Sequence, residues 1–154
     1  MVLITKIRNS GHVILTTIRL FFLRNVYHMD ISKSARISFW AMLDKTYPKG
    51  IHIGDESFVA SGAMIFTHDY CRGLHEDTRI GKRCFIGARS IIMPGISIGD
   101  EVIVGAGSIV TKDVKSHCII AGNPAEIIKQ NIHTGKFGII KHEFSMNETG
   151  DTSL

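Results

Sequence analysis

IGKRCFIGARSIIMPGISIGDEVIVGAGSIV, the stretch from Ile80 to Val110, repeats with a period of six residues. An apolar residue opens each repeat, and glycine follows it in four of the six repeats. The six apolar positions are Ile80, Ile86, Ile92, Ile98, Val104 and Val110. A helix repeats about every 3.6 residues and a strand about every 2, so neither period fits. The six-residue step instead predicts a short strand and a sharp turn in each repeat, with three repeats closing one triangular coil.

Successive coils of this kind stack their apolar residues in columns. Ile80 is expected beneath Ile98, and Ile86 beneath Val104, inside a prism whose coils are joined by parallel backbone hydrogen bonds. The small residue after each apolar one is expected to let the backbone turn the corner. The sequence therefore predicts an all-β solenoid, a parallel β-helix whose hand the period alone does not determine.

Two interruptions divide the repeat. The same period runs from Ile53 to Ile65, but fifteen residues then separate Ile65 from Ile80. If the coil continues through this gap, the nine residues beyond one step must loop out, and we place this insertion at about 67–79. A smaller insertion separates Ile53 from Leu43, the end of a fainter run of the same period.

The composition is that of one ordered domain. The 154 residues are 44% hydrophobic and 21% charged, with a net charge of +4, which excludes a disordered chain and decides little about partners. The predicted segments are an N-terminal helical segment (1–28), a β-helix of about four to five coils (29–122), a short C-terminal helix (123–132) and a poorly ordered tail (133–154).

The stretch from His12 to Tyr27 is strongly apolar, but Arg19 and Arg24 interrupt it. No uncharged run reaches the roughly 18 to 20 residues of a membrane span, and no signal-peptide cleavage site follows. We expect a helix that packs on its own domain or on a neighbouring subunit, with a helix lying on a membrane surface (12–27) as the alternative. Three cysteines without a CxxC pair favour a reduced, cytoplasmic setting, with the inner face of the plasma membrane as the peripheral alternative.

The ladder from Ile80 to Val114, followed by IIAGNPAEIIK, resembles the hexapeptide-repeat acyltransferases. It is most similar to the small bacterial O-acetyltransferases of sugars and surface polysaccharides, and the likeness covers about residues 29–130 with the elements VTKDV, AGNPA and THD. The resemblance implies a left-handed β-helix, acetyl-CoA as donor and a homotrimer with active sites between subunits. It implies O-acetylation of a sugar hydroxyl in capsule, O-antigen or exopolysaccharide synthesis, with N-acetylation of a nucleotide-linked amino sugar as the alternative.

Acetyl transfer from a thioester to a hydroxyl needs a base, and a histidine with an ordinary pKa near 6.5 suits that role. His68 follows Ile65 by three residues, where the coil gives way to the insertion, and the family likeness implies that it is the general base in a direct attack on the thioester. Asp69 is expected to orient the His68 ring or to cap the loop, and Asp44 to bond to a hydroxyl or to His68. Two further residues are candidates for contact with the acceptor, Trp40 and His75. For all of these except His68, a packing, turn or solvated-loop role stays equally open.

The cofactor is expected where glycine-bearing turns bring the backbone close to a ligand. A backbone N–H near Gly87 and Ala88 is expected to hold the oxyanion, and Gly105 with Ala106 to line the pantetheine arm. Three residues nearer the C-terminus are candidates for the rest of the cofactor: Lys112 and Lys129 for the phosphates, and Pro124 for the adenine. A solvated surface charge is the alternative for each lysine.

Other functions fit the sequence less well. A carbonic anhydrase on this fold would need three zinc histidines at matching corners, and His52, His68, His75 and His117 do not stack in that way, so no metal site is predicted. A scaffold without catalysis would need neither a histidine at the coil exit nor the VTKDV and AGNPA elements. A serine acetyltransferase or a nucleotide-sugar N-acetyltransferase is expected to carry more chain before the β-helix than these 28 residues. Nucleic-acid binding has no supporting basic helix or basic–aromatic stripe.

Overall fold

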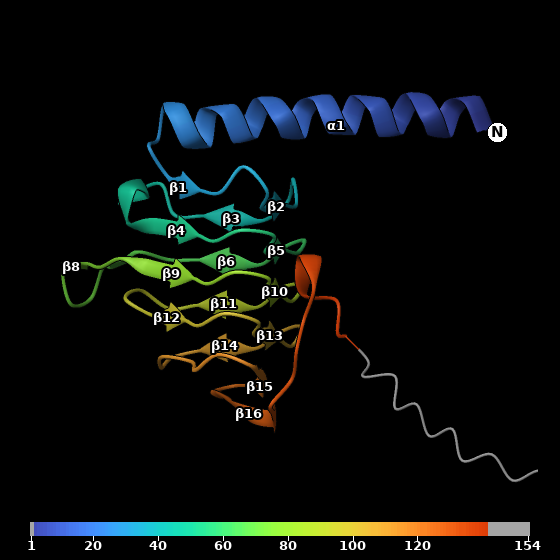
Figure 1. The fold of residues 1–154 in the computed structure, drawn as a ribbon. Coiled ribbons are helices and arrows are strands. Elements are labelled where there is room, and N and C mark those ends of the chain that lie inside the picture. The colour runs from blue at the N-terminus through green and yellow to red at the C-terminus, as the bar shows by residue number, and fades with distance from the viewer. Residues whose placement is uncertain (1, 142–154) are drawn as a thin grey trace, which may run out of the picture.

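The computed structural model describes residues 2–141, with side chains from Val13 onward. Helix α1 (Val2–Asn25) comes first and lies across one end of a stack of coils (Figure 1). The coils follow one another away from the helix, and the last described residues turn back along the stack. The solenoid predicted from the six-residue period is confirmed.

Three sheets form the faces of a prism, and each full coil contributes one short strand to each sheet. Sheet I contains β1 (Asp30–Ile31), β4 (Ile51–Ile53), β9 (Thr78–Ile80) and β12 (Ser97–Ile98). Sheet II contains β2 (Arg36–Ile37), β5 (Phe58–Val59), β10 (Phe85–Ile86), β13 (Ile103–Val104), β15 (Cys118–Gly122) and β16 (Ala125–Gln130). Sheet III contains β3 (Met42–Leu43), β6 (Met64–Ile65), β11 (Ile91–Ile92) and β14 (Ile109–Val110).

The coils and edges of the prism can be named from this order. Coils one to four end with β3, β6, β11 and β14, and a partial fifth coil consists of β15 and a bridge between Val114 and Ile98. The edges are called I–II, II–III and III–I after the sheets that they join. A 3-10 helix, η1 (Pro48–Gly50), fills the smaller insertion between coils one and two. The four to five coils predicted from the sequence are therefore present.

The core is the interior of the prism, where the inward residue of each strand stacks on the equivalent residue of the next coil. The predicted neighbours Ile80 and Ile98 pair directly, as do Ile86 and Val104. The three buried columns are Ile31, Ile53, Ile80 and Ile98; Ile37, Val59, Ile86, Val104 and Ile120; and Leu43, Ile65, Ile92 and Val110. Burial of these aliphatic side chains is the main favourable term that holds the coils together.

The glycine after each apolar residue provides space between coils and does not make the turn. A Cβ atom on Gly81 would lie 2.5 Å from the carbonyl oxygen of Gly99, and one on Gly87 would lie 2.4 Å from that of Val104. Neither glycine has a positive φ; at the first of these corners the left-handed residue is Arg83, with a φ of 52°. The expectation that the small residue lets the backbone turn is therefore wrong, because its role is to let adjacent coils approach.

Helix α1 packs on its own domain, which is one of the arrangements expected for the apolar stretch from His12 to Tyr27. Leu23 is buried in the core, and the Arg19 and Arg24 guanidinium groups donate hydrogen bonds to the carbonyl oxygens of Ser38 (2.8 Å) and Ser32 (2.7 Å). Large apolar side chains remain exposed on its other faces and just after its end: Val13, Ile14, Leu15, Ile18, Phe21 and Phe22 in the helix, and Val26 after it. Within residues 2–141, no helix has the length and hydropathy of a membrane span.

The short C-terminal helix predicted for residues 123–132 is wrong. The chain reverses after β15, and β16 pairs with it antiparallel, with Gly122 opposite Ala125. The adjacent β-branched residues Ile127 and Ile128 favour a strand, and the pairing supplies partners for the backbone of the last strand in sheet II. Pro124, expected in the first turn of a helix, lies instead in the turn between the two strands.

Residues 132–141 also differ from the prediction, because they pack along the prism and do not form a loose tail. This C-terminal strap runs up the I–II edge and contains the 3-10 helix η2 (Lys136–Gly138) (Figure 1). Thr134 is fully buried, and its hydroxyl donates to the carbonyl oxygen of Arg83 at 2.7 Å. Further along, the N–H of Phe137 donates to the carbonyl oxygen of Glu56 at 2.6 Å. The rest of the predicted tail, 142–154, lies outside the described residues.

Candidate active site

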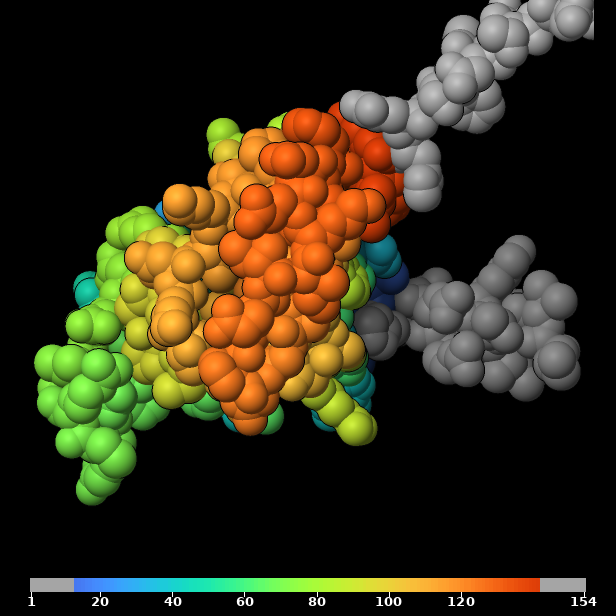
Figure 2. All heavy atoms as spheres, turned by 90° about the horizontal axis from the view of Figure 1, so that it is seen from below, coloured from blue at the N-terminus to red at the C-terminus, as the bar shows by residue number. Residues whose placement is uncertain are grey.

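The predicted insertion forms a hairpin that stands out from the III–I edge between coils two and three. Its strands are β7 (His68–Asp69) and β8 (Leu74–His75). Two buried threonines hold its base, because the hydroxyls of Thr67 and Thr78 donate hydrogen bonds of 2.7 and 2.6 Å to backbone carbonyls. Figure 2 shows the hairpin, in green, projecting from the body of the molecule. The coil therefore continues beneath a firmly attached protrusion, and His68 lies where the two meet.

Asp44 holds His68 in place from the preceding coil. It follows β3 directly, and β3 pairs with β6, so both residues leave sheet III at the same edge. The Oδ2 atom of Asp44 accepts hydrogen bonds from the backbone N–H groups of Thr67 (3.0 Å) and His68 (3.1 Å) and from the Nδ1 atom of the His68 ring. Its Oδ1 atom accepts a bond of 2.8 Å from the N–H of Thr46. The carboxylate is thus the centre from which the histidine and its backbone are positioned.

This environment keeps the Asp44 carboxylate ionised. Burial raises its pKa, but the hydrogen bonds from Thr67, His68 and Thr46 outweigh that effect and hold the pKa well below its ordinary value. Since an ionised carboxylate only accepts hydrogen bonds, the His68 Nδ1 atom must carry a proton, and in the neutral form of the ring the lone pair is then on Nε2. Within the described part of the chain, Nε2 meets no hydrogen-bond partner. The ring is therefore fixed through Nδ1, while Nε2 is left without a partner in the described chain.

Of the other residues predicted around His68, two lie in the hairpin with it and one lies at a different edge of the prism. His75 is paired directly opposite His68, and its ring lies 5.5 Å from that of Tyr47. Asp69, expected as the catalytic partner or as a cap of the loop, takes the second role, because its carboxylate bonds to Arg72 at 2.7 Å and not to the histidine. Trp40 lies at the II–III edge, on the other side of sheet III, with 69% of its surface exposed.

The residues predicted to bind the cofactor are spread over the II–III edge, the III–I edge beyond His68 and the far end of the prism. Gly87–Ala88 and Gly105–Ala106 lie at the II–III edge on coils three and four. In the described chain, the N–H groups of Ala88 and Ala106 meet no acceptor, so they are available donors. Lys112 follows β14 at the III–I edge, two coils beyond His68, while Pro124 and Lys129 belong to the β15–β16 turn and to β16.

The outer face of sheet III separates His68, at the III–I edge, from Ala88 and Ala106, at the II–III edge, and this face is apolar. Its outward side chains stack in register through all four coils: Met42, Met64, Ile91 and Ile109. None of the four is buried in this single chain. The equivalent outward positions of sheet I carry Asp30, His52, Arg79 and Ser97. A groove of about 360 Å³ opens beside this apolar ladder, and its lining includes Asp44, Lys45, Phe66 and Arg19.

Comparison with known proteins adds a family context. Residues 77–112 match the family model described as the hexapeptide repeat of succinyl-transferase. The chain is 33% identical over 109 residues to a putative acetyltransferase, YvoF, of Bacillus subtilis, which covers 68% of this chain and 62% of that protein. It is 34% identical over 129 residues to serine acetyltransferase 2 of Arabidopsis thaliana, which covers 80% of this chain and 39% of that protein. The chain thus spans less than two thirds of the length of either curated relative.

Solved structures agree on the fold. A maltose O-acetyltransferase from Clostridium difficile 630 matches with a TM-score of 0.54 and 29% identity, covering 66% of this chain and 68% of that chain. A hexapeptide-repeat containing acetyltransferase from Vibrio cholerae matches with a TM-score of 0.59, 75% and 81% coverage and 20% identity, a likeness of fold alone. The repeat match and the fold likeness confirm the left-handed parallel β-helix.

Proposed function

We propose that this chain, which belongs to the hexapeptide-repeat acyltransferases, transfers an acetyl group from acetyl-CoA to a hydroxyl group of a sugar. The observation that carries the proposal is the Asp44–His68 pair. A buried carboxylate fixes the ring at Nδ1, and the partly exposed ring keeps Nε2 without a hydrogen-bond partner at the base of a protruding hairpin. This is the arrangement that a general base needs in order to act on an exposed hydroxyl.

The reaction follows from this geometry in two steps. Nε2 of His68 removes the proton of the acceptor hydroxyl while its oxygen attacks the thioester carbonyl, and Asp44 stabilises the imidazolium that forms. The tetrahedral oxyanion is stabilised by a backbone N–H, for which the free amides of Ala88 and Ala106 are the candidates. When the intermediate collapses, the carbon–sulfur bond breaks, the thiolate of CoA leaves, and the His68 proton is available to neutralise it. The acetyl group is then an ester on the acceptor.

The site requires more than one copy of the chain in this proposal. His68 lies at the III–I edge, whereas Ala88 and Ala106 lie at the II–III edge, and sheet III separates them. A trimer that buries the outward Met42–Met64–Ile91–Ile109 ladder would bring the III–I edge of one copy toward the II–III edge of another. The acetyl-CoA chain would then lie between subunits, with Lys112 near its phosphates.

A sugar is the favoured acceptor class, as a constituent or precursor of a surface polysaccharide. The structural match with the maltose O-acetyltransferase covers 66% of this chain and 68% of that protein, so the two are alike over a similar share of their lengths. The hairpin offers an exposed aromatic ring, Tyr70 at 92% exposure, and Trp40, at 69% exposure, lies at the II–III edge that the proposed trimer would bring toward it; both rings suit the apolar faces of a pyranose. A cytoplasmic location, where acetyl-CoA is available and thiols stay reduced, belongs to the same proposal.

The experiment is release of CoA thiol from acetyl-CoA, measured across a panel of acceptors. The panel includes neutral sugars, nucleotide-linked amino sugars and free serine, so that O-acetylation of a sugar is separated from the N-acetyl and serine alternatives. His68→Asn should abolish most turnover with little change in acetyl-CoA binding, whereas His28→Asn, at an exposed position after α1, should behave as wild type. Equal turnover in both variants, or release with free serine alone, would contradict the proposal.

A further inference from the structure

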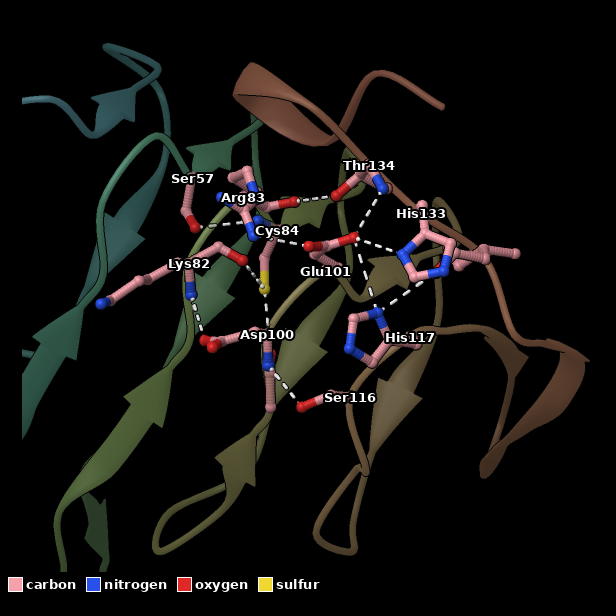
Figure 3. Close-up of polar contacts among 12 residues, drawn as sticks. Ser57, Lys82, Arg83, Cys84, Asp100, Glu101, Ser116, His117, His133 and Thr134 are labelled. Carbon is pink, nitrogen blue, oxygen red and sulfur yellow. Dashed lines mark hydrogen bonds and ion pairs between the residues drawn. The ribbon is translucent and has the colours of Figure 1, made fainter. Parts of the chain in front are cut away.

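Glu101 is a buried carboxylate at the I–II edge of coil four, well away from the III–I edge that carries His68. Its Oε1 atom accepts a hydrogen bond of 2.6 Å from Arg83, and its Oε2 atom accepts one of 2.8 Å from the N–H of Thr134 in the C-terminal strap (Figure 3). Burial raises the pKa of Glu101, but the bonds from Thr134 and Arg83 outweigh it and lower the pKa to about 2. A permanent negative charge therefore lies beneath the strap.

Two histidines converge on the same carboxylate oxygen from different segments. His117 precedes β15, and His133 belongs to the strap; their Nδ1 atoms lie 3.5 and 3.4 Å from the Oε2 atom of Glu101 (Figure 3). The two rings are 5.0 Å apart. Both separations from Oε2 exceed the roughly 2.7 to 3.2 Å of a good N–H···O hydrogen bond. The Nδ1 atom of His117 also meets the carbonyl oxygen of Ile132 at 3.3 Å, a contact that the ring would give up on binding an ion. Among the described residues, no short hydrogen bond accounts for the approach of both rings to Oε2.

The same spacing suits ligands around a metal ion. Bonds of about 2.0 to 2.1 Å in a tetrahedral arrangement place neighbouring ligand atoms about 3.3 to 3.4 Å apart. One ligand atom from each of Glu101, His117 and His133 can be chosen so that all three lie within 4.8 Å of one another. The side chains of His117 and His133 are 43% and 59% exposed, so the protein around them leaves room for the rings to adjust to an ion. Two imidazoles with one carboxylate favour ions such as Zn²⁺ and Co²⁺ over Mg²⁺ and Ca²⁺.

The charges around the cluster permit a cation. Arg83 bonds to the other oxygen, Oε1, and two further carboxylates, those of Glu56 and Asp100, are close enough to act on its guanidinium. Three carboxylates against one guanidinium leave this corner negative. Since Arg83 contacts Oε1, the Oε2 atom keeps a lone pair for a metal bond beside the N–H of Thr134.

We propose that Glu101, His117 and His133 bind one divalent transition-metal ion of the Zn²⁺ class, through Oε2 and the two Nδ1 atoms, with a fourth position open to solvent. The ion joins the C-terminal strap to coils four and five at the I–II edge. Because this edge is not the one that carries His68, the metal takes no part in acetyl transfer, and its role is structural: it holds the strap against the coils. Its presence is independent of the function proposed above.

The test is a titration of the full chain, freed of metal by a chelator, with Zn²⁺ alone and with Co²⁺ alone. Calorimetry should give one ion per chain, and Co²⁺ should produce the visible absorption of a four-coordinate nitrogen–oxygen site. His117→Asn and His133→Asn should each weaken binding by at least about 100-fold, because loss of an outer-shell partner alone costs about 10- to 100-fold. Asparagine tolerates the left-handed φ of 65° at His117. Zn²⁺ should also slow amide exchange at Thr134 in the wild type and not in these variants.

The matched control is His28→Asn, an exposed histidine that also has a left-handed backbone, with a φ of 54°. Its affinity for Zn²⁺ should stay within about threefold of wild type, and the metal-free melting temperatures of all three variants should agree with wild type, which shows that they fold. Absence of saturable binding, or equal losses in the control and in the His117 and His133 variants, would overturn the proposal. So would binding that survives both of these substitutions but is lost on His142→Asn, since the ion would then lie elsewhere.

Discussion

Replacing Asp44 by asparagine tests the charge behind His68 while preserving the size of the side chain. The carboxylate accepts four hydrogen bonds from Thr67, His68 and Thr46, two of them from His68. An amide oxygen can keep the three that reach Oδ2, but the amide nitrogen then faces the N–H of Thr46 and cannot accept from it. Loss of one charge-assisted bond and weakening of three others should lower the free energy of unfolding by about 1 to 3 kcal/mol.

The effect on turnover should be larger than the effect on stability. Unit charges about 4 Å apart attract by about 4 kcal/mol at an effective dielectric of about 20, and this attraction is present only when His68 becomes an imidazolium. Since each 1.36 kcal/mol is a factor of ten in rate, about 4 kcal/mol corresponds to nearly 10³-fold. His68 is partly open to solvent, which screens the interaction, so we expect kcat to fall by about 10²- to 10³-fold.

The assay is CoA thiol release at saturating acetyl-CoA with the acceptor that the panel identifies. The KM for acetyl-CoA should stay within about threefold, because Asp44 acts on the charge that develops during the reaction. Asp69→Asn is the matched control, since it makes the same chemical change at a carboxylate that bonds to Arg72 in the hairpin. If Asp44→Asn keeps more than about a fifth of the wild-type kcat, or loses no more than Asp69→Asn, the role assigned to the pair is refuted.

Three further outcomes follow from pH, packing and assembly. The pKa of Asp44 is depressed in the folded chain, so the ionised carboxylate stabilises the fold above about pH 4, and this stabilisation is lost as the pH falls through the folded-state pKa. The urea midpoint of the wild type should therefore fall more steeply below about pH 4 than that of Asp44→Asn. Gly87→Ala puts a Cβ 2.4 Å from the carbonyl oxygen of Val104 and should destabilise the fold by about 2 kcal/mol or more, and an unchanged thermal melt would contradict the close contact between coils. Met64→Glu should dissociate the proposed trimer in light scattering while Ser97→Glu, outward on sheet I, leaves it intact, and equal masses would argue against sheet III as the interface.

The sequence predicted the coils well because their determinants are local and periodic. A buried aliphatic residue every six positions defines which residues stack, and the pairing of Ile80 with Ile98 follows from counting alone. The same counting places Asp44 and His68 at one edge, since Leu43 stacks on Ile65. What counting cannot provide is the path of the hairpin after His68, which turns Asp69 toward Arg72 and leaves Asp44 as the partner of the ring.

The C-terminal segments were missed because their structure depends on the surface that receives them. Ile127 and Ile128 are compatible with helix or strand in a run this short, and the unpaired backbone of β15 decides for a strand. The strap has no hydrophobic period, since it is held by isolated hydrogen bonds such as those of Thr134 and Phe137. The convergence of His133 on Glu101 has no signature in the sequence, because 32 positions separate the two residues.

The strap changes how the β-helix should unfold. In an ordinary solenoid each coil interacts only with its neighbours, so the terminal coil can fray while the rest stays folded. Here the strap leaves the fifth coil and bonds to Arg83 in coil three and Glu56 in coil two. Fraying at the C-terminal end must therefore break contacts near the middle of the stack, which couples the end coil to the coil that carries His68. These long-range contacts raise the contact order, and we expect slower folding and a single cooperative transition where a linear array would melt from its end.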